Sequence, residues 1–405
     1  MHLQWTPEQR ATRALFHDIG ARSTLDRPRP GAFDTETWHL LGEAGLWRLI
    51  VPKEHGGDGA GWWAFTAALE GLAASGRAPG LLLSVIAQAG LVRALERHGT
   101  SAQRARFFPR LLAGELGATG IADPDTGTDV RSTSTLLTAQ ANETFRLDGA
   151  KYNIAHAPEC GFMLVVCKLA GEGREGISLV LIDADLPGIR VGAPDAKLGN
   201  HDLPTSWMTF DDVRLDYGHL LGEAGRGLRN LIDIVSLGRI YYGLVAAWCL
   251  EPMLARAVDY ATDRETFGVP ILDHQHVQRR LVDIRIGMEA ARWTSYAALD
   301  RLLRGEDEAV MLCSVAKILG ADSAVAGALH LLRLYGSKGY QAGEVSDFLR
   351  DALAFCSVGG TDEMHRRNIV NQMTRLHRRA EVPAARTAVP PLLRAAPPPL
   401  AAAGD

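Results

Sequence analysis

The stretch ADPDTGTD at residues 122–129 marks the point where the periodicity of the sequence changes. Before it, from residue 7 to about residue 117, apolar residues recur at helical spacing between glycine-rich breaks. After it, from residue 119 to about residue 217, short β-rich runs are separated by turn residues, which is typical of a small β domain. Within the stretch, Gly127 and Thr128 can present a backbone N–H and a hydroxyl to an anion, as phosphate-binding turns do.

The region after this stretch contains several strand signals. The Asp148-Gly149 pair is a strong hairpin turn, and β-rich runs follow at residues 162–168, 177–183 and 207–215. Because no helical segments separate these runs, they are not βαβ units, and a parallel dinucleotide-binding sheet is disfavoured. The spacing predicts a small antiparallel sandwich or barrel.

Helical periodicity returns after Gly227. Apolar residues repeat at 4-3 spacing over residues 277–302 and 311–332, and such stripes pack helices at the shallow angle of a bundle. From Pro383 the chain is rich in proline and alanine, which predicts a flexible tail. We therefore expect an α+β multidomain chain. Its parts are an N-terminal helical domain (1–118), a middle antiparallel β domain (119–219), a C-terminal four-helix bundle (220–380) and a Pro/Ala-rich tail (381–405).

The composition argues against several classes of protein. The chain has 405 residues, with 43 Lys and Arg against 47 Asp and Glu, and its formal net charge of -4 argues against a nucleic-acid or membrane-surface binder. Five cysteines without a CxxC pair argue against a disulfide framework, and His274 and His276 do not share a helix face, so no metal site is expected. Without an uninterrupted apolar run of about 18 residues or a secretory signal, a cytoplasmic protein without membrane spans is expected.

Five groups of short motifs occur in order along the chain. They are GLW at 45–47 with VP at 51–52 and GGDG at 56–59; ADPDTGTD at 122–129; LG at 198–199 with FDDV at 210–213 and LGEAGRG at 221–227; RETFG at 264–268 with Gln275; and YGSKGY at 335–340 with RD at 350–351 and GGTDE at 359–363. Their order and spacing resemble the acyl-CoA dehydrogenase superfamily over about residues 45–378. Members of that superfamily bind FAD between a middle β domain and a C-terminal four-helix bundle, so the resemblance implies this fold and this cofactor.

The resemblance also implies which residues contact FAD. An arginine such as Arg264 suits a pyrophosphate, because its guanidinium donates two parallel hydrogen bonds, and Phe267 could pack on the flavin ring. In the superfamily this segment reaches the FAD of a neighbouring subunit, which implies a homodimer or homotetramer. The full expected set is Ala122, Gly127, Thr128, Asn153, Ala155, Arg264, Phe267, Gln275, Gly336, Thr361 and Glu363.

The sequence departs from the superfamily at the catalytic base. Typical members use a Glu to abstract the α-proton of the acyl thioester while a hydride leaves the β-carbon for the flavin. That position is Gly359 here, and Gly238 occupies the position that carries the base in another branch. A positioned general base contributes about 10²–10⁴-fold in rate, so ordinary α,β-dehydrogenation should be poor unless another group substitutes. The backbone N–H of Gly359 can still polarise a thioester carbonyl.

Other residues near the expected flavin also differ. Ala122 stands where Thr is usual, Asn153 where Trp is usual, and Ala155 where a hydroxyl is usual. The candidates for a substitute acid or base are His156, which we favour as a non-carboxylate group, and Glu363, which the resemblance places nearer the nucleotide. For the acyl group, the expected contacts are Tyr241, Tyr242 and Gly359.

Three functions are consistent with these residues. The first is an FAD-dependent oxidoreductase of an acyl-CoA or acyl carrier protein thioester, with a non-standard base or regiochemistry such as γ,δ-dehydrogenation. Such divergent members resemble enzymes of bacterial specialised metabolism, including polyketide biosynthesis, and use an electron-transfer flavoprotein or oxygen as acceptor. The second is a flavin-dependent hydroxylase on the same fold. The third is a non-catalytic subunit that completes a partner's FAD site through Arg264, Phe267 and Gln275.

Overall fold

The N-terminal part is helical, as expected. The computed structural model describes residues 4–23, 32–76, 78–173 and 176–381. Capping boxes at Thr6 and Thr100 satisfy the first backbone N–H groups of two of the helices. The helices of this part are α1 (Pro7–Arg22), α2 (Thr35–Glu43), α3 (Trp62–Ala74), α4 (Pro79–His98) and α5 (Ser101–Leu112).

The middle part is a seven-stranded sheet. Its strands are β1 (Gly117–Gly120), β2 (Leu136–Ala139), β3 (Thr144–Ala155), β4 (Phe162–Leu169), β5 (Ile177–Asp183), β6 (Ile189–Val191) and β7 (Thr205–Asp216). The long antiparallel pairing of β3 with β7 and the pairing of β4 with β5 agree with the sequence prediction. β1 and β2 each pair with β4 in parallel, so the expectation of an entirely antiparallel sheet was wrong. The chain between β1 and β4 contains β2 and β3 and is long enough for such a parallel return.

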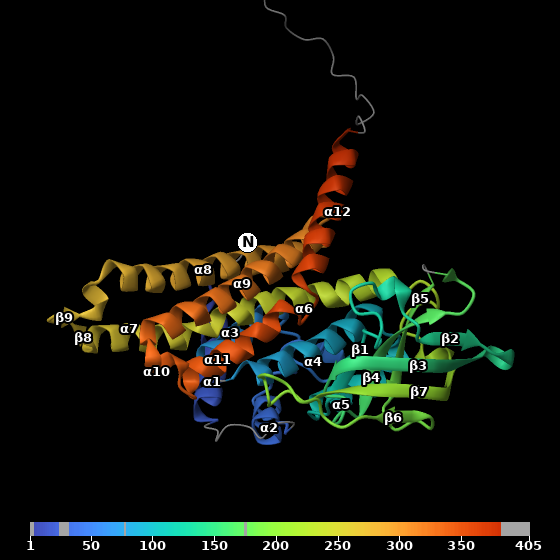
Figure 1. Cartoon of the computed structure of the whole chain (residues 1–405). Helices are drawn as coiled ribbons and strands as arrows, with labels where there is room; N and C mark the ends of the chain where they lie inside the picture. The colour runs from blue at the N-terminus through green and yellow to red at the C-terminus, as the bar shows by residue number, and fades with distance from the viewer. Residues whose placement is uncertain (1–3, 24–31, 77, 174–175, 382–405) are drawn as a thin grey trace, which may run out of the picture.

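The C-terminal part is a helical bundle in which α7 continues α6 almost end to end, and the two together run beside α8 and α9 (Figure 1). A short hairpin closes the bundle end far from the sheet, and α12 projects away from the body of the molecule. The elements are α6 (Leu228–Trp248), α7 (Leu250–Asp263), β8 (Glu265–Thr266), β9 (Val269–Pro270), α8 (Gln275–Leu303), α9 (Ala309–Tyr335), α10 (Ser337–Tyr340), α11 (Glu344–Leu353) and α12 (Asp362–Glu381). Residues 382–405 of the expected tail lie outside the described part of the chain.

Two hydrophobic cores share strand β4. Phe162, Leu164 and Val166 belong to the larger core, which also contains the N-terminal helices and the bundle. The alternate residues Met163 and Val165 belong to a smaller core inside the β domain. Because side chains alternate between the faces of a strand, β4 joins the β domain to both helical parts.

Three helical stretches are long and apolar enough to cross a membrane by length and composition alone. They are Pro79–His98, Leu228–Asp263 and Ala309–Tyr335. All three contribute side chains to the larger hydrophobic core, where helices pack against helices. Their apolar composition is therefore accounted for by packing within the fold.

The bundle is held close by two glycines that face each other. A Cβ atom on Gly320 of α9 would lie 2.0 Å from the carbonyl oxygen of Gly243 of α6, and one on Gly243 would lie 2.3 Å from that of Ala316. Neither position has room for a methyl group, so these glycines set the separation of α6 and α9.

We expect Gly320→Ala to lower the free energy of unfolding by about 1–3 kcal/mol, because the new methyl group forces the two helices apart. The matched control is Gly90→Ala in α4, where the nearest atom, Cγ2 of Ile234, lies 4.0 Å from the new Cβ. The free energy of unfolding of this control should rise by up to about 1 kcal/mol, because alanine has a higher helix propensity than glycine. Denaturant unfolding of both variants measures the difference, and equal stability of the two would contradict this account of the α6–α9 contact.

Candidate active site

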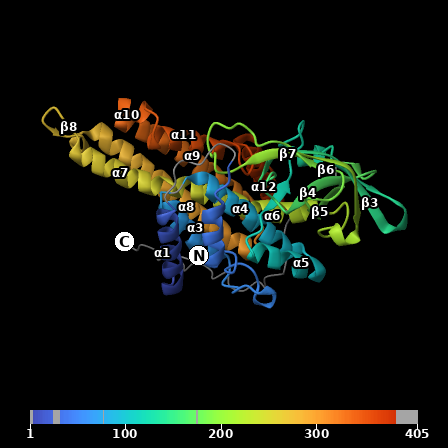
Figure 2. The same ribbon diagram turned by 90° about the horizontal axis from the view of Figure 1, so that it is seen from below.

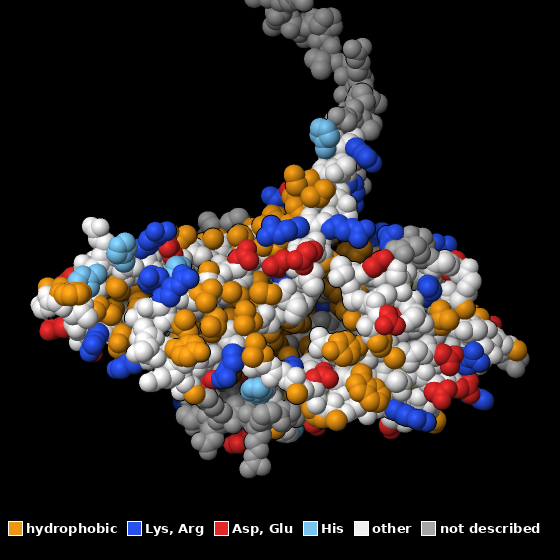
Figure 3. All heavy atoms as spheres, in the orientation of Figure 1, with side chains coloured by type: hydrophobic (Ala, Val, Ile, Leu, Met, Phe, Trp, Pro, Cys, Tyr) orange, Lys and Arg blue, Asp and Glu red, His pale blue; other side chains and the backbone are white. Residues whose placement is uncertain are grey.

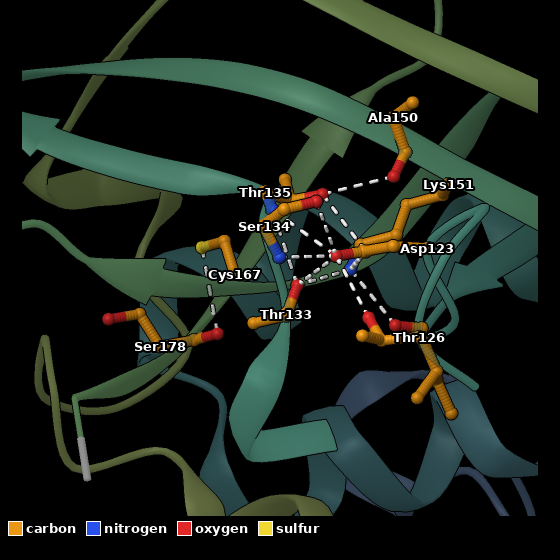
Figure 4. A network of polar contacts seen from close by, with 10 residues as sticks. Asp123, Thr126, Thr133, Ser134, Thr135, Ala150, Lys151, Cys167 and Ser178 are labelled. Carbon is orange, nitrogen blue, oxygen red and sulfur yellow. Dashed lines mark hydrogen bonds and ion pairs between the residues drawn. The ribbon is translucent and has the colours of Figure 1, made fainter. Parts of the chain in front are cut away.

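The loop at residues 122–129 is anchored by a buried ion pair. Asp123 and Lys151 have no exposed side-chain surface, and the Lys151 ammonium donates to Asp123, to the carbonyl of Ile121 at 2.9 Å and to Oγ1 of Thr133 at 3.1 Å (Figure 4). Asp123 also accepts hydrogen bonds from the hydroxyl groups of Thr133 at 2.8 Å and Thr135 at 3.1 Å. The network joins the loop to β3 and fixes the backbone beside Ala122.

The charges in this network depend on each other. Burial by itself raises the pKa of Asp123, but the hydrogen bond and charge of Lys151, with the bonds from Thr133 and Ser134, outweigh it and hold the pKa at about 2. Burial lowers the pKa of Lys151, and Asp123 opposes that shift. The pair is therefore ionised at neutral pH, and removing one partner leaves a buried charge uncompensated.

Strand β3 carries an irregularity at the expected flavin contacts. The register with β7 shifts between Lys151 and Ile154, and Asn153 has a φ of 51°, in the left-handed region. Asn153 is exposed, Ala155 is half-buried, and the backbone N–H of Tyr152 donates to the carbonyl of Ala122 at 2.8 Å. Ala122 and Asn153 are thus brought together by the backbone rather than by side-chain contacts.

His156 lies in the interior. Its side chain is fully buried, with Nδ1 3.1 Å from the carbonyl oxygen of Gly117 and the ring against Phe33 and Trp38. Burial lowers its pKa to about 4, and the Gly117 carbonyl only partly offsets this. The imidazole is neutral at physiological pH and is packed among aromatic rings, so this position does not favour the acid–base role that the sequence suggested.

Gly238 and Gly359, the two predicted base positions, face one tyrosine ring. A Cβ atom on Gly359, whose φ is 72°, would lie 2.5 Å from Cδ2 of Tyr242, and one on Gly238 would lie 3.5 Å from Cε2 of the same ring. Burial raises the pKa of Tyr242 to about 12, so its phenol stays protonated at neutral pH. Tyr242 therefore occupies space beside both positions at which the sequence predicts a missing carboxylate.

Tyr241 has a different environment from Tyr242. It is fully buried, and its hydroxyl lies 3.2 Å from Oγ1 of Thr66 and donates to the carbonyl of Trp62 at 3.3 Å. These partners belong to the start of α3. The side chain thus joins α6 to α3, and only Tyr242 of the two tyrosines faces the glycines.

Thr361 and Glu363 lie at the start of α12. The Thr361 hydroxyl accepts a hydrogen bond from the backbone N–H of Met364 at 3.4 Å, which caps the helix. The Glu363 carboxylate is exposed, and hydrogen bonds from its own backbone and from Thr361 lower its pKa. This places Glu363 on the surface of the helix rather than over Gly359.

The remaining predicted cofactor residues lie at the opposite end of the bundle. Arg264 and Phe267 belong to the β8–β9 hairpin, Gln275 begins α8, and Gly336 joins α9 to α10. Figures 1 and 2 place β8 far from the strands of the β domain. Phe267 is 98% exposed, so within the described part of its own chain its ring makes little contact beyond the edge of the His274 ring, with 6.2 Å between the ring centroids. One chain therefore does not bring these residues to the loop that contains Gly127 and Thr128.

Sequence reasoning missed several residues of the site. Lys151 could have been noticed, because a lysine amid a predicted β-rich segment beside a turn needs a partner when buried. Arg239 of α6 and His365 of α12, which lie beside Gly359 and Gly360, gave no sequence signal, because their proximity arises only when the helices pack.

Comparison with known proteins identifies the domains. Models of the N-terminal, middle and C-terminal domains of acyl-CoA dehydrogenase match residues 6–115, 118–213 and 225–374. An acyl-CoA dehydrogenase of Bacillus subtilis is 32% identical over 90% of this chain and 97% of its own length. The L-prolyl-[peptidyl-carrier protein] dehydrogenase of Pseudomonas fluorescens is 26% identical over 84% of this chain and 90% of its own.

A solved structure agrees with this assignment. Butyryl-CoA dehydrogenase from Megasphaera elsdenii superimposes with a TM-score of 0.86 and 27% identity, covering 92% of this chain and 100% of that one. The expected order of helical, β and helical parts is thereby confirmed, and so is the family resemblance that implied FAD as cofactor.

We expect Asp123→Asn to destabilise the β domain by about 3–5 kcal/mol, because it leaves the Lys151 ammonium buried without a counter-charge. The control Asp125→Asn changes an exposed carboxylate of the same loop and should alter stability by less than about 0.5 kcal/mol. Denaturant unfolding of both variants tests this, and equal losses would count against the ion pair as the anchor.

The same variants measured against pH test the ionic origin of the effect. Since the folded pKa of Asp123 is below its unfolded value of about 3.9, its stabilisation is complete above that value and is lost as the pH falls toward 2. The difference in the free energy of unfolding between the wild type and Asp123→Asn should therefore become smaller below about pH 4.

Proposed function

This chain belongs to the acyl-CoA dehydrogenase family, and from that premise we propose that it oxidises an acyl thioester with FAD without either of the family's usual carboxylate bases. The observation that carries the proposal is the ring of Tyr242, which lies against both Gly238 and Gly359. A neutral phenol can donate a hydrogen bond to the substrate, whereas it is a poor acceptor for an α-proton.

The described residues fit a flavin nucleotide. A Cβ atom on Gly127 would meet no atom within 4 Å, so the loop is open on the side where an anion would approach. Figure 3 shows a recess between the bundle and the β domain. Ala122, Gly127, Thr128, Asn153 and Ala155 would line the β-domain side, and Thr361 with Glu363 would contribute from α12. When bound, FAD supplies the acceptor for a hydride.

We propose that Arg264, Phe267, Gln275 and Gly336 complete the FAD site of a neighbouring subunit. Support comes from the exposure of Phe267 and from the distance between the hairpin and the β domain along the bundle (Figure 1). Either a homodimer or a homotetramer would supply these residues from a second copy.

The proposed chemistry acts away from the usual α,β-position. The backbone N–H of Gly359 would polarise the thioester carbonyl, and Tyr242 would line the acyl pocket. We propose γ,δ-dehydrogenation of an already unsaturated acyl chain, in which bound FAD would accept a hydride and solvent water would accept the proton. The setting we propose is bacterial specialised metabolism such as polyketide assembly. The carrier is CoA or a carrier protein, and the relative named for a peptidyl-carrier protein substrate supports the second choice. The proposed acceptor of the electrons is an electron-transfer flavoprotein or oxygen.

Anaerobic titration of the purified yellow protein tests the proposal. Bleaching of the flavin absorbance by a 2-enoyl thioester, with little bleaching by the saturated thioester, is the expected result. A flavin that stays oxidised with every thioester, and that instead needs a flavin reductase and oxygen for turnover, would support a hydroxylase on the same fold. Activity seen only after a sister subunit is added would support the non-catalytic role.

We expect Gly238→Glu to raise the rate of flavin reduction by a saturated acyl thioester about 100-fold or more, because it restores a carboxylate at a family base position. A side chain fits there, since a Cβ on Gly238 makes only ordinary contact with Tyr242. The control Gly238→Gln has the same size without the charge and should stay at the wild-type rate. Stopped-flow absorbance measures this, and equal rates for Glu and Gln would exclude a base at this place.

We expect Phe267→Ala to reduce the FAD retained after gel filtration severalfold while leaving the free energy of unfolding of the apoprotein within about 0.5 kcal/mol, because the ring makes little contact within the described part of its own chain. The control is Leu15→Ala in α1, another exposed apolar residue. Equal FAD content in the two variants would contradict the proposed role in a neighbouring subunit's site.

A further inference from the structure

Three basic side chains from three helices converge beside Gly359 and Gly360. Arg239 comes from α6, Lys317 from α9 and His365 from α12, and we call them the basic cluster. Lys317 is 1% exposed and has its own counter-ion, since its ammonium lies 3.2 Å from Oδ1 of Asp362.

Arg239 has no such counter-ion in the described part of the chain. Its Nη2 donates to the sulfur of Met364 at 3.7 Å, and its Nε is buried without a hydrogen-bond partner. Burial lowers the pKa of the guanidinium, and Cys313 opposes this shift. A guanidinium remains charged in proteins, so this cation has lost water without gaining an anion.

The ring of His365 also lacks hydrogen-bond partners in the described part of the chain. Its side chain is fully buried, and neither ring nitrogen completes a hydrogen bond within the described residues. Burial, followed by the charges of Arg239 and Lys317, lowers its pKa to about 3, while the nearby backbone of Gly359 and Gly360 only partly opposes this. The ring is neutral at physiological pH, so one nitrogen carries a hydrogen that it can donate.

The cluster adjoins both vacant base positions. Arg239 directly follows Gly238, and a Cβ atom on Gly360 would lie 3.2 Å from Nε2 of His365. Two carboxylates face this region: Asp322 lies in the field of Arg366 and Lys317, and Asp362 pairs with Lys317. The uncompensated positive charge is therefore on Arg239, whose guanidinium contacts Met364, the side chain that lies against Gly360.

We infer that the basic cluster binds a carboxylate carried by the acyl chain, so that the substrate is the monothioester of a dicarboxylic acid. The Arg239 guanidinium offers parallel donors that match the two oxygens of a carboxylate, and the neutral His365 ring offers one more. The ligand thus supplies the anion that the chain lacks at positions 238 and 359. This inference rests on the proposed function, since it names the substrate class for the same pocket.

The test compares matched CoA thioesters on the FAD-loaded enzyme without oxygen. Glutaryl-CoA and valeryl-CoA have acyl chains of equal carbon number and differ in the terminal carboxylate, and calorimetric titration gives the dissociation constant of each. We expect glutaryl-CoA to bind at least about tenfold more tightly, the size of effect typical of hydrogen bonds to a charged group. Equal affinities in the wild-type enzyme would overturn the inference without any variant.

Variants assign the preference to the cluster. In Arg239→Gln the affinities for glutaryl-CoA and valeryl-CoA should become about equal. Arg239→Lys keeps the positive charge and should retain part of the preference for glutaryl-CoA. The control Arg367→Gln removes an exposed cation of α12 and should keep the wild-type ratio. If Arg239→Gln still bound glutaryl-CoA more tightly than valeryl-CoA by the wild-type ratio, the carboxylate would bind elsewhere and the inference would be overturned.

Flavin absorbance recorded in the same titration separates the two proposals. Preferential binding of glutaryl-CoA with a flavin that stays oxidised throughout, and with every other thioester, would support the carboxylate site and count against the proposed oxidation. Flavin reduction by 2-enoyl thioesters without any preference for a carboxylate would support the oxidation and overturn the carboxylate site.

Discussion

The close approach of α6 and α9 through Gly243 and Gly320 is the constraint on which the bundle and its site depend. Arg239 lies one helical turn before Gly243, and Lys317 lies three residues before Gly320, so both side chains belong to the faces that these glycines bring together. The start of α12 then adds His365 to the same place. Three basic side chains are thus gathered where two backbones nearly touch, and small movements of either helix would change the distances between their charges.

The fold could be predicted from the sequence because its signals are local. The change of period near residue 119 and the motifs from residue 45 onward located the helical, β and helical parts. The parallel pairing of β1 and β2 with β4 could not be predicted, because it depends on which edge of a strand remains available after the hairpins form. Strands that pair across a long separation in sequence produce no local periodicity from which their pairing could be predicted.

The candidate site was predictable in part. The expectation that Gly238 and Gly359 stand at the usual base positions follows from the motifs, but the contact of the Tyr242 ring with both depends on the packing of α6 beside the segment before α12. The burial of His156 could not be predicted for a related reason. The shift in register of β3 precedes this residue, and its ring packs in the interior with Phe33 and Trp38. A bulge of one residue decides which face of a sheet a side chain reaches.

The nearly complete exposure of Phe267 has a consequence for how such an enzyme behaves at low abundance. A cofactor site assembled from two chains follows mass action, because each chain holds the flavin weakly until the other arrives. Dilution would then release flavin together with subunits, and added flavin would in turn favour association. On the proposed arrangement, the loading of the enzyme would rise with its own concentration and with the supply of the vitamin-derived nucleotide, without any dedicated regulatory site.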